Sequence, residues 1–152
     1  MSEEIKEVNN IKAEKFKKFL AEKEISVFQE EVLEDELQSM VFRSHIEVGG
    51  QNLPTVLIID NSIYTILRVQ IVNGVINEEN RVAVLELINK FNSQYKVFKY
   101  YVTDSGDLCL DCCLSFTEEN FEAELVRVII DVVLQHLVEE YPKIMRAIWA
   151  EK

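Results

Sequence analysis

Residues 39–72 read SMVFRSHIEVGGQNLPTVLIIDNSIYTILRVQIV, and this stretch decides the fold class. Turn residues separate three runs that are rich in β-branched and aromatic side chains: 39–48, 53–59 and 63–72. Gly49-Gly50 suits the positive φ angles of a tight hairpin, and Asp60-Asn61-Ser62 is typical of a turn. The stretch therefore predicts three strands joined as an antiparallel meander.

The same logic, extended toward both ends of the chain, predicts the other elements. Two further strands are expected at 96–103 and 108–116, on either side of Asp104-Ser105-Gly106-Asp107. Apolar residues that recur every three or four positions predict three helices: 10–23, 78–92 and 118–140. We therefore expect an α+β fold of order α-β-β-β-α-β-β-α, with an antiparallel sheet of about five strands and flanking helices.

Two segments fall outside this regular pattern. The acidic segment 24–38 is expected to be a connection with an extended piece near Ile25–Phe28. Tyr141-Pro142 is expected to break or kink the last long helix, because proline lacks the amide N–H that a helix needs. A short final helix is then expected at 143–150.

Length and charge limit what the protein can be. A chain of 152 residues is typical of one domain, so we expect a single domain over 1–152, with 1–9 flexible or extending the first helix. Its 27 acidic and 16 basic residues give a formal net charge of −11. This charge argues against nucleic acids and anionic membrane surfaces as partners, since both are bound through clusters of Lys and Arg.

The distribution of apolar residues and cysteines predicts the compartment. No apolar run reaches the ~18 residues of a membrane-spanning helix. Residues 1–10 are acidic and polar, unlike the basic start and apolar core of a signal peptide. The three cysteines are an odd number and adjoin one another in sequence, which does not make a disulfide framework. We therefore expect the protein in the cytoplasm, where thiols stay reduced.

Cys109-Leu110-Asp111-Cys112-Cys113 is the most tempting chemical motif, because Cys-x-x-Cys suits a metal or redox site on a turn. It falls inside an expected strand, where Cys109 and Cys112 would point to opposite faces of the sheet. Cys109 and Cys113 would share a face about 13 Å apart, and a zinc ion would need two further ligands. We expect buried or half-buried thiols here, and we predict no metal and no cofactor.

Other catalytic constellations are equally weak. His45 lies in an expected strand and His136 in an expected helix, and neither has a Ser or Cys nucleophile in a nearby turn. The acidic runs Glu30–Asp35 and Glu118–Glu122 are typical of solvated faces or helix caps. The two glycine-rich phosphate-binding motifs, G-x-x-x-x-G-K-[ST] and G-x-G-x-x-G, are both absent from the sequence. We therefore predict that the protein is not an enzyme and has no catalytic residue.

Four short motifs lie at the turns, caps and helix ends of the second half of the chain: Asn77-Glu78-Glu79-Asn80, Leu87-Ile88-Asn89-Lys90-Phe91-Asn92, Asp104-Ser105-Gly106-Asp107 and Tyr141-Pro142-Lys143-Ile144. Through them 77–149 resembles the YbjN family of bacterial sensory-transduction regulators. The upstream Phe42-Arg43-Ser44 and Ile46-Glu47-Val48 fit the same pattern. The resemblance implies the fold of type III secretion chaperones: a five-stranded antiparallel sheet with helices packed on it, usually as a homodimer. In those chaperones the fold holds a partly unfolded protein segment on apolar patches, and the YbjN family has no catalytic residues to carry over.

The expected helix 118–138 is apolar on nearly every side, and such a helix is buried on nearly every side. Three arrangements would bury it: the C-terminal tail folds back over it, a second subunit packs on it, or it lines an open groove for a client segment. The candidate interface residues are those that lie beyond a single core-facing stripe, together with the tryptophan of the tail: Val126, Ile130, Val133, Leu134, Leu137 and Trp149.

These observations lead to two predicted functions. The first is a non-catalytic protein-binding module, chaperone-like or a signalling regulator, that acts as a homodimer and binds a protein client or a signalling partner. The alternative is a small-molecule-sensing regulatory domain with a pocket between the sheet and the helices.

Overall fold

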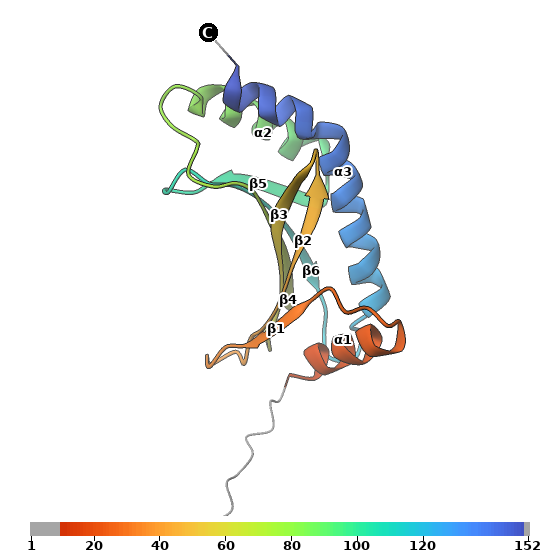
Figure 1. Cartoon of the computed structure of the whole chain (residues 1–152). Helices are drawn as coiled ribbons and strands as arrows, with labels where there is room; N and C mark the ends of the chain where they lie inside the picture. The colour runs from red at the N-terminus through yellow and green to blue at the C-terminus, as the bar shows by residue number, and fades with distance from the viewer. Residues whose placement is uncertain (1–9, 151–152) are drawn as a thin grey trace, which may run out of the picture.

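The computed structural model describes residues 10–150, so the prediction made for residues 1–9 lies outside the described residues. The elements follow the order α-β-β-β-β-α-β-β-α, which confirms the α+β class. Six antiparallel strands, one more than expected, form a single sheet in the order β1-β2-β3-β4-β6-β5. The helices pack mainly on one side of this sheet (Figure 1).

The predicted meander forms the middle of the sheet. Its strands are β2 (Met40–Val48), β3 (Gln51–Ile59) and β4 (Tyr64–Val72). Gly49 and Gly50 close the first hairpin at φ angles of 59° and 78°, which glycine adopts without strain. The second predicted hairpin joins β5 (Phe98–Val102) to β6 (Leu108–Ser115), and β6 pairs with β4.

The sixth strand, β1 (Gln29–Val32), lies in the segment that was expected to be a connection. It pairs antiparallel with β2 at the edge of the sheet, and all four of its residues are exposed. The sequence did not predict this strand, because an edge strand with no buried side needs no alternating apolar residues and β1 contains two glutamates. Glu31 is instead held to its neighbour strand by Arg43, at 2.8 Å.

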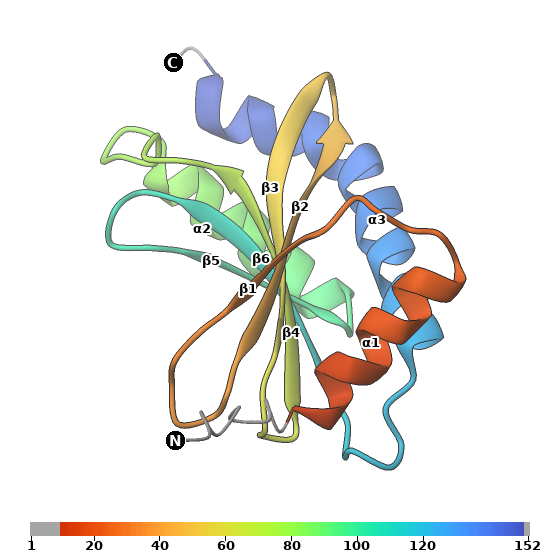
Figure 2. The same ribbon diagram turned by 60° about the horizontal axis from the view of Figure 1, so that its bottom comes forward.

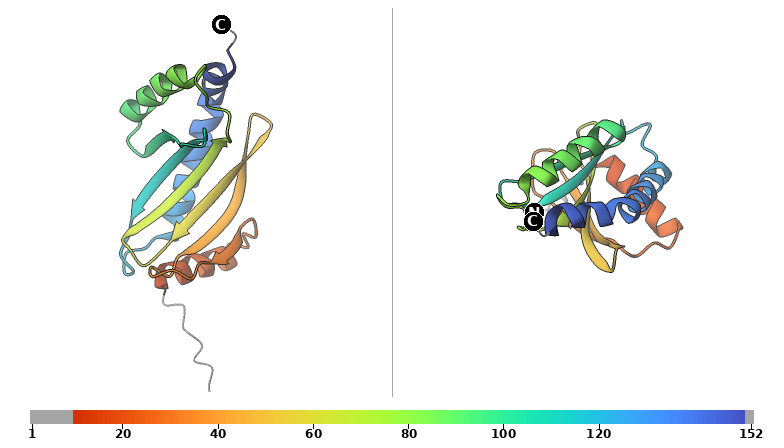
Figure 3. Two further views of the ribbon diagram at one scale, coloured as in Figure 1. Left: turned by 90° about the vertical axis from the view of Figure 1, so that its left-hand side faces the viewer. Right: turned by 90° about the horizontal axis from the view of Figure 1, so that it is seen from above.

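Three helices pack against the sheet: α1 (Ile11–Glu22), α2 (Arg81–Gln94) and α3 (Ala123–Trp149). In Figure 2, α1 lies beside the N-terminal half of α3. The left view of Figure 3 shows the opposite face of the sheet, in front of α3, and no helix crosses that face. The sheet therefore has a covered face and an uncovered face.

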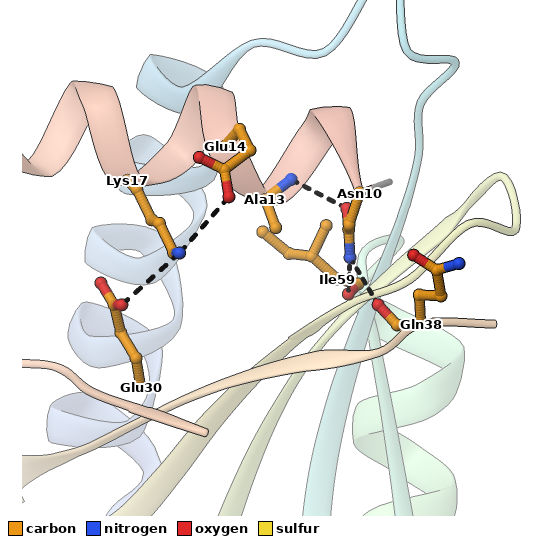
Figure 4. A network of polar contacts seen from close by, with 7 residues as sticks. All are labelled: Asn10, Ala13, Glu14, Lys17, Glu30, Gln38 and Ile59. Atoms are coloured by element: carbon orange, nitrogen blue, oxygen red, sulfur yellow. Dashed lines mark hydrogen bonds and ion pairs between the residues drawn. The ribbon is translucent and has the colours of Figure 1, made fainter. Parts of the chain in front are cut away.

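One side chain at the start of α1 links the helix to the sheet. Asn10 accepts a hydrogen bond from the Ala13 amide at 3.0 Å, which caps the helix. Its side-chain nitrogen donates to the carbonyl oxygens of Gln38, at 2.9 Å, and Ile59, at 2.8 Å (Figure 4). Lys17 adds an ion pair with Glu30, at 3.9 Å. The helix start is thus attached to the end of β3 and to the segment that precedes β2.

Helix α3 corrects the prediction of a separate final helix at 143–150, because it runs unbroken through Pro142 for 27 residues. The prediction of a kink is confirmed, since the helix bends from the sheet face toward α2 in Figure 1. Proline removes only one helical donor, and Ile144 and Ile148 beyond it are buried. Burial of this apolar face keeps the last turns helical.

Helices α2 and α3 begin later than the predicted 78 and 118. Side chains of Asn77 and Asn80 bond to each other's backbone amides, and Thr117 and Asn120 do the same. Each pair closes a turn before its helix. The N-caps are therefore Asn80 for α2 and Glu122 for α3, and not the Asn77 and Thr117 that the predicted helix starts would imply.

Candidate functional site

The six candidate interface residues occupy three different environments. Val126, Val133 and Leu137 are buried in the core, so they contact the rest of this chain. Ile130 and Leu134 are half-buried and pack against that core. Trp149 is 60% exposed at the end of α3. The structure therefore does not bring the six together on one surface.

One of the three proposed arrangements is contradicted. The tail cannot fold back over the helix, because residues 143–149 continue α3 itself. What remains exposed on the N-terminal half of α3 is a different set of residues. We call Leu125, Val128 and Val132 the α3 stripe; they are 39%, 40% and 41% exposed and follow the i, i+3, i+7 spacing of one helix face.

The cysteines lie on a strand, as expected, and on both of its faces. Cys112 is fully buried in the core, and burial raises its pKa to about 11. Cys113 is exposed on the uncovered face. Cys109 is buried beside Tyr101, and desolvation raises the pKa of its thiol as well. Raised pKa values disfavour the thiolate that metal binding and redox chemistry require.

His136 is a buried residue of α3, and its side chain lies in a cluster of aromatic rings. Its ring centre is 4.4 Å from that of Tyr95 and 4.5 Å from that of Phe98. The Tyr100 hydroxyl is 2.6 Å from Nε2 of His136, and burial lowers the histidine pKa. His45 is exposed on β2. Among residues 10–150, no group of three His, Cys, Asp or Glu side chains could hold a metal ion.

A polar network and an apolar row share the uncovered face of the sheet. Arg68 donates two hydrogen bonds to Asp111, both at 2.9 Å, and the Tyr101 hydroxyl donates a third at 3.2 Å. The ion pair raises the pKa of Arg68. Beside it, Ile58 and Ile66 face each other across β3 and β4 and are half-buried. This face is therefore polar around Asp111 and apolar around Ile58 and Ile66.

A cavity of about 500 Å³ lies between sheet and helix where β3 and β4 separate. We call it the sheet cleft. Its walls are residues 51–54 of β3, residues 70–73 at the end of β4, and three side chains of α3: Tyr141, Met145 and Trp149. A pocket between sheet and helices was expected, but its residues could not be named, because they come from three distant segments. Of the lining residues, only Trp149 was a predicted site residue, and it was predicted for an interface.

Comparison with known proteins identifies the family. The YbjN family model, described as "Putative bacterial sensory transduction regulator", matches residues 16–145. None of the curated proteins compared with the chain matches it. In the part of the chain that the structure describes, no helix is both long enough and apolar enough to cross a membrane.

Proposed function

Because this chain belongs to the YbjN family of sensory transduction regulators, we propose that it regulates by binding proteins and not by catalysis, and that it works as a homodimer. The observation that carries this proposal is the α3 stripe. Three apolar side chains at the spacing of one helix face are left about two-fifths exposed on the longest helix. A stripe of this kind is the surface through which two helices pack.

A symmetric dimer suits this surface. In a two-fold dimer each patch meets its own copy, so an apolar stripe is automatically complementary to itself. Electrostatics limit the contact to such a patch, since two chains of net charge −11 repel each other elsewhere. The half-buried Ile129, which lies one turn beyond Leu125, extends the contact surface.

Substitution on two sides of the same helix tests this proposal. Val132→Lys places a charge on the α3 stripe, whereas Val138→Lys places the same charge at a position that is 55% exposed and outside the stripe. We expect wild type and Val138→Lys to sediment as dimers and Val132→Lys as a monomer, because two buried lysines would face each other. A wild-type chain that remains monomeric at high concentration, or two variants with equal mass, would contradict the dimer.

The partner proposed for the dimer is an apolar segment of another protein, held in a chaperone-like or signalling role. The uncovered face of the sheet supports this, since Val56, Ile58 and Ile66 form a half-buried apolar patch there without a covering helix. The proposed compartment is the cytoplasm, in keeping with three free cysteines. Crosslinking from Cys113, which is exposed on this face, is the measurement that locates a bound partner.

A second candidate function is small-molecule sensing, and the sheet cleft favours it. Its volume of about 500 Å³ lies within the range of sites that hold small ligands. The cleft joins the β2–β3 hairpin to the C-terminal end of α3, so a ligand there would contact both. A rise in melting temperature on ligand addition is the first measurement for this function, because any ligand of the native state stabilises it.

A further inference from the structure

The sheet cleft exists because two neighbouring strands stop pairing while both continue. The β3–β4 ladder runs from Ile59 and Thr65 to Thr55 and Val69. Beyond it, β3 extends to Gln51 and β4 to Val72, each with a partner on its other side only. In the left view of Figure 3 the β2–β3 hairpin bends away from β4. The facing strand edges therefore carry backbone donors and acceptors without a strand partner.

The hairpin is held in this position by contact with α3. A Cβ atom on Gly49 would lie 2.7 Å from the ring of Tyr141, so the turn packs directly on that ring. Gly49 also has a φ of 59°, which other residues rarely adopt. The cleft is thus bounded on one side by a hairpin whose turn packs against α3.

Four polar side chains in the cleft are amides, and they lie beside the hydroxyl of Tyr141 and the indole N–H of Trp149. Gln51, Asn52, Gln70 and Asn73 line it, and their side-chain amides make no hydrogen bond within residues 10–150. Each amide offers a donor and an acceptor side by side. The wall formed by α3 consists of the aromatic rings of Tyr141 and Trp149 and the thioether of Met145. Within the described residues, no charged side chain lines the cleft.

The residues that line the cleft indicate which class of ligand it would bind. A site without charged groups, in a chain of net charge −11, favours neither anions nor strongly hydrated cations. Paired donors and acceptors on Asn and Gln match the polar edge of a nucleobase, as in their bidentate contacts with adenine. An exposed indole ring provides the face on which such a ring stacks.

An extended peptide is the main competitor, since free strand edges attract strands. Two features of these edges oppose it. Pro54 removes a donor from the β3 edge. On β4 the register shifts between Gln70 and Val72, and a bulge of this kind interrupts pairing. A regular ladder could not continue along either edge, whereas a small ring needs only two or three groups.

We propose that the sheet cleft binds an uncharged planar heterocycle whose edge carries neighbouring hydrogen-bond donors and acceptors, as a nucleobase does. The ring stacks on Trp149 and its polar edge meets Gln70 and Asn52. This inference rests on the second candidate function and not on self-association. A ligand bound in the cleft would contact both the β2–β3 hairpin and the C-terminal end of α3.

Trp149 makes the test direct, because it is the only tryptophan in the chain. The full-length protein is titrated with adenosine, guanosine, cytidine and uridine while its tryptophan fluorescence is measured. We expect a saturable change with at least one nucleoside, and an affinity at least about tenfold lower for the corresponding 5′-monophosphate, whose charge the cleft does not neutralise. No change with any of the four nucleosides up to millimolar concentration would overturn the proposal, and equal affinity for the monophosphate would overturn its selectivity for uncharged ligands.

Matched variants separate the site from the fold. Gln70→Met keeps length and removes the amide, and we expect it to lower nucleoside affinity about tenfold. Gln135→Met, the same change at an exposed position of α3 outside the cleft, should leave affinity unchanged. Equal affinities in the two variants would overturn the assignment. The neutral peptide acetyl-Gly-Leu-Gly-amide is the last probe: its binding in place of the nucleosides would show peptide recognition and reject the heterocycle.

A melting-temperature rise with other small molecules, but with none of the nucleosides, would leave sensing standing while rejecting this ligand class. If no small molecule raises the melting temperature and no nucleoside binds, both small-molecule sensing and the proposed ligand class are rejected. Because the dimer is tested at Val132 and the cleft at Gln70, the outcome of one experiment does not decide the other.

Discussion

The two faces of the sheet use the same strands for different purposes. On the covered face, side chains such as Phe42, Leu57 and Leu67 are at most 1% exposed under the helices. On the uncovered face, their neighbours along the chain include Val56 and Ile58, which are only half-buried. Alternation in a strand gives each face its own set of residues. The covered face supplies most of the stability, because its side chains are fully buried. Side chains on the uncovered face are therefore available for contact with a partner.

The largest expected difference comes from truncating two adjacent residues. Leu57→Ala should lower the free energy of unfolding by about 2–5 kcal/mol, because it leaves a cavity in a closed core. Ile58→Ala removes a similar volume on the other face and should cost less than about 1.5 kcal/mol, since water already reaches it. Urea unfolding of both variants measures the difference. Equal losses would mean that something covers the second face in solution.

Adjacent cysteines give the next largest difference. Cys112 faces the core, where burial raises its pKa to about 11, and Cys113 is exposed on the other face. Little thiolate forms at neutral pH on a thiol with so high a pKa, so Cys112 should react with iodoacetamide at least about tenfold more slowly than Cys113. Mass spectrometry of the labelled peptide measures both rates. Equal rates in the folded protein would contradict the assignment of faces, and equal rates in urea are the control.

A smaller effect is expected from the ion pairs on the uncovered face. Arg68→Met leaves the buried carboxylate of Asp111 without its charged partner and should cost about 1 kcal/mol, reduced by the partial exposure of Arg68. Arg43→Met is the matched control, because its partner Glu31 is exposed and loses little. Denaturation midpoints of the two variants test this order. A larger loss from Arg43→Met would show that β1 depends on its ion pair.

The smallest effect is a dependence of stability on pH from the covered face. Burial lowers the pKa of His136, although Glu140 and Glu139 act in the opposite direction. The unfolded chain then binds the proton more readily, so stability is complete above the ordinary histidine pKa of about 6.5 and falls as pH decreases below it. His136→Gln should remove this part of the slope between about pH 7 and 5.5, by less than 1 kcal/mol.

The His136 experiment needs two further considerations. Tyr100 and Tyr95 also contact the ring, and Gln was chosen because it retains an acceptor for the Tyr100 hydroxyl. His45→Gln, at an exposed position of β2, is the control for the substitution itself. Urea midpoints at the two pH values supply the slopes. An unchanged slope in His136→Gln would assign the pH dependence to other groups.

Most of the fold could be predicted, and the reasons for success and failure are physical. Gly49-Gly50 and the strands around it follow from local turn chemistry and alternation, so the meander was predicted correctly. β1 was missed because a strand exposed on both sides carries no apolar period. The final helix was wrongly separated at Pro142, because the buried Ile144 and Ile148 outweigh one missing hydrogen bond.

The candidate site was less predictable, since exposure is not a local property. A helix that is apolar on many sides predicts extra burial, but it does not show which neighbours provide it. Val126, Val133 and Leu137 proved to be core residues, while Leu125 and Val132 remained exposed. A pocket between sheet and helices was expected, but the residues of the sheet cleft could not be predicted, because its amides come from β3 and from the end of β4, and its aromatic wall from α3.

From residue order alone came the α+β class, the turns, the acidic charge and the family, because each depends on neighbours within a few positions or on simple composition. Tertiary structure decided which face of the sheet is covered, which side of α3 is exposed, and where β3 and β4 part to form the sheet cleft. These features depend on contacts between residues far apart in the chain, and only the packed fold brings such residues together.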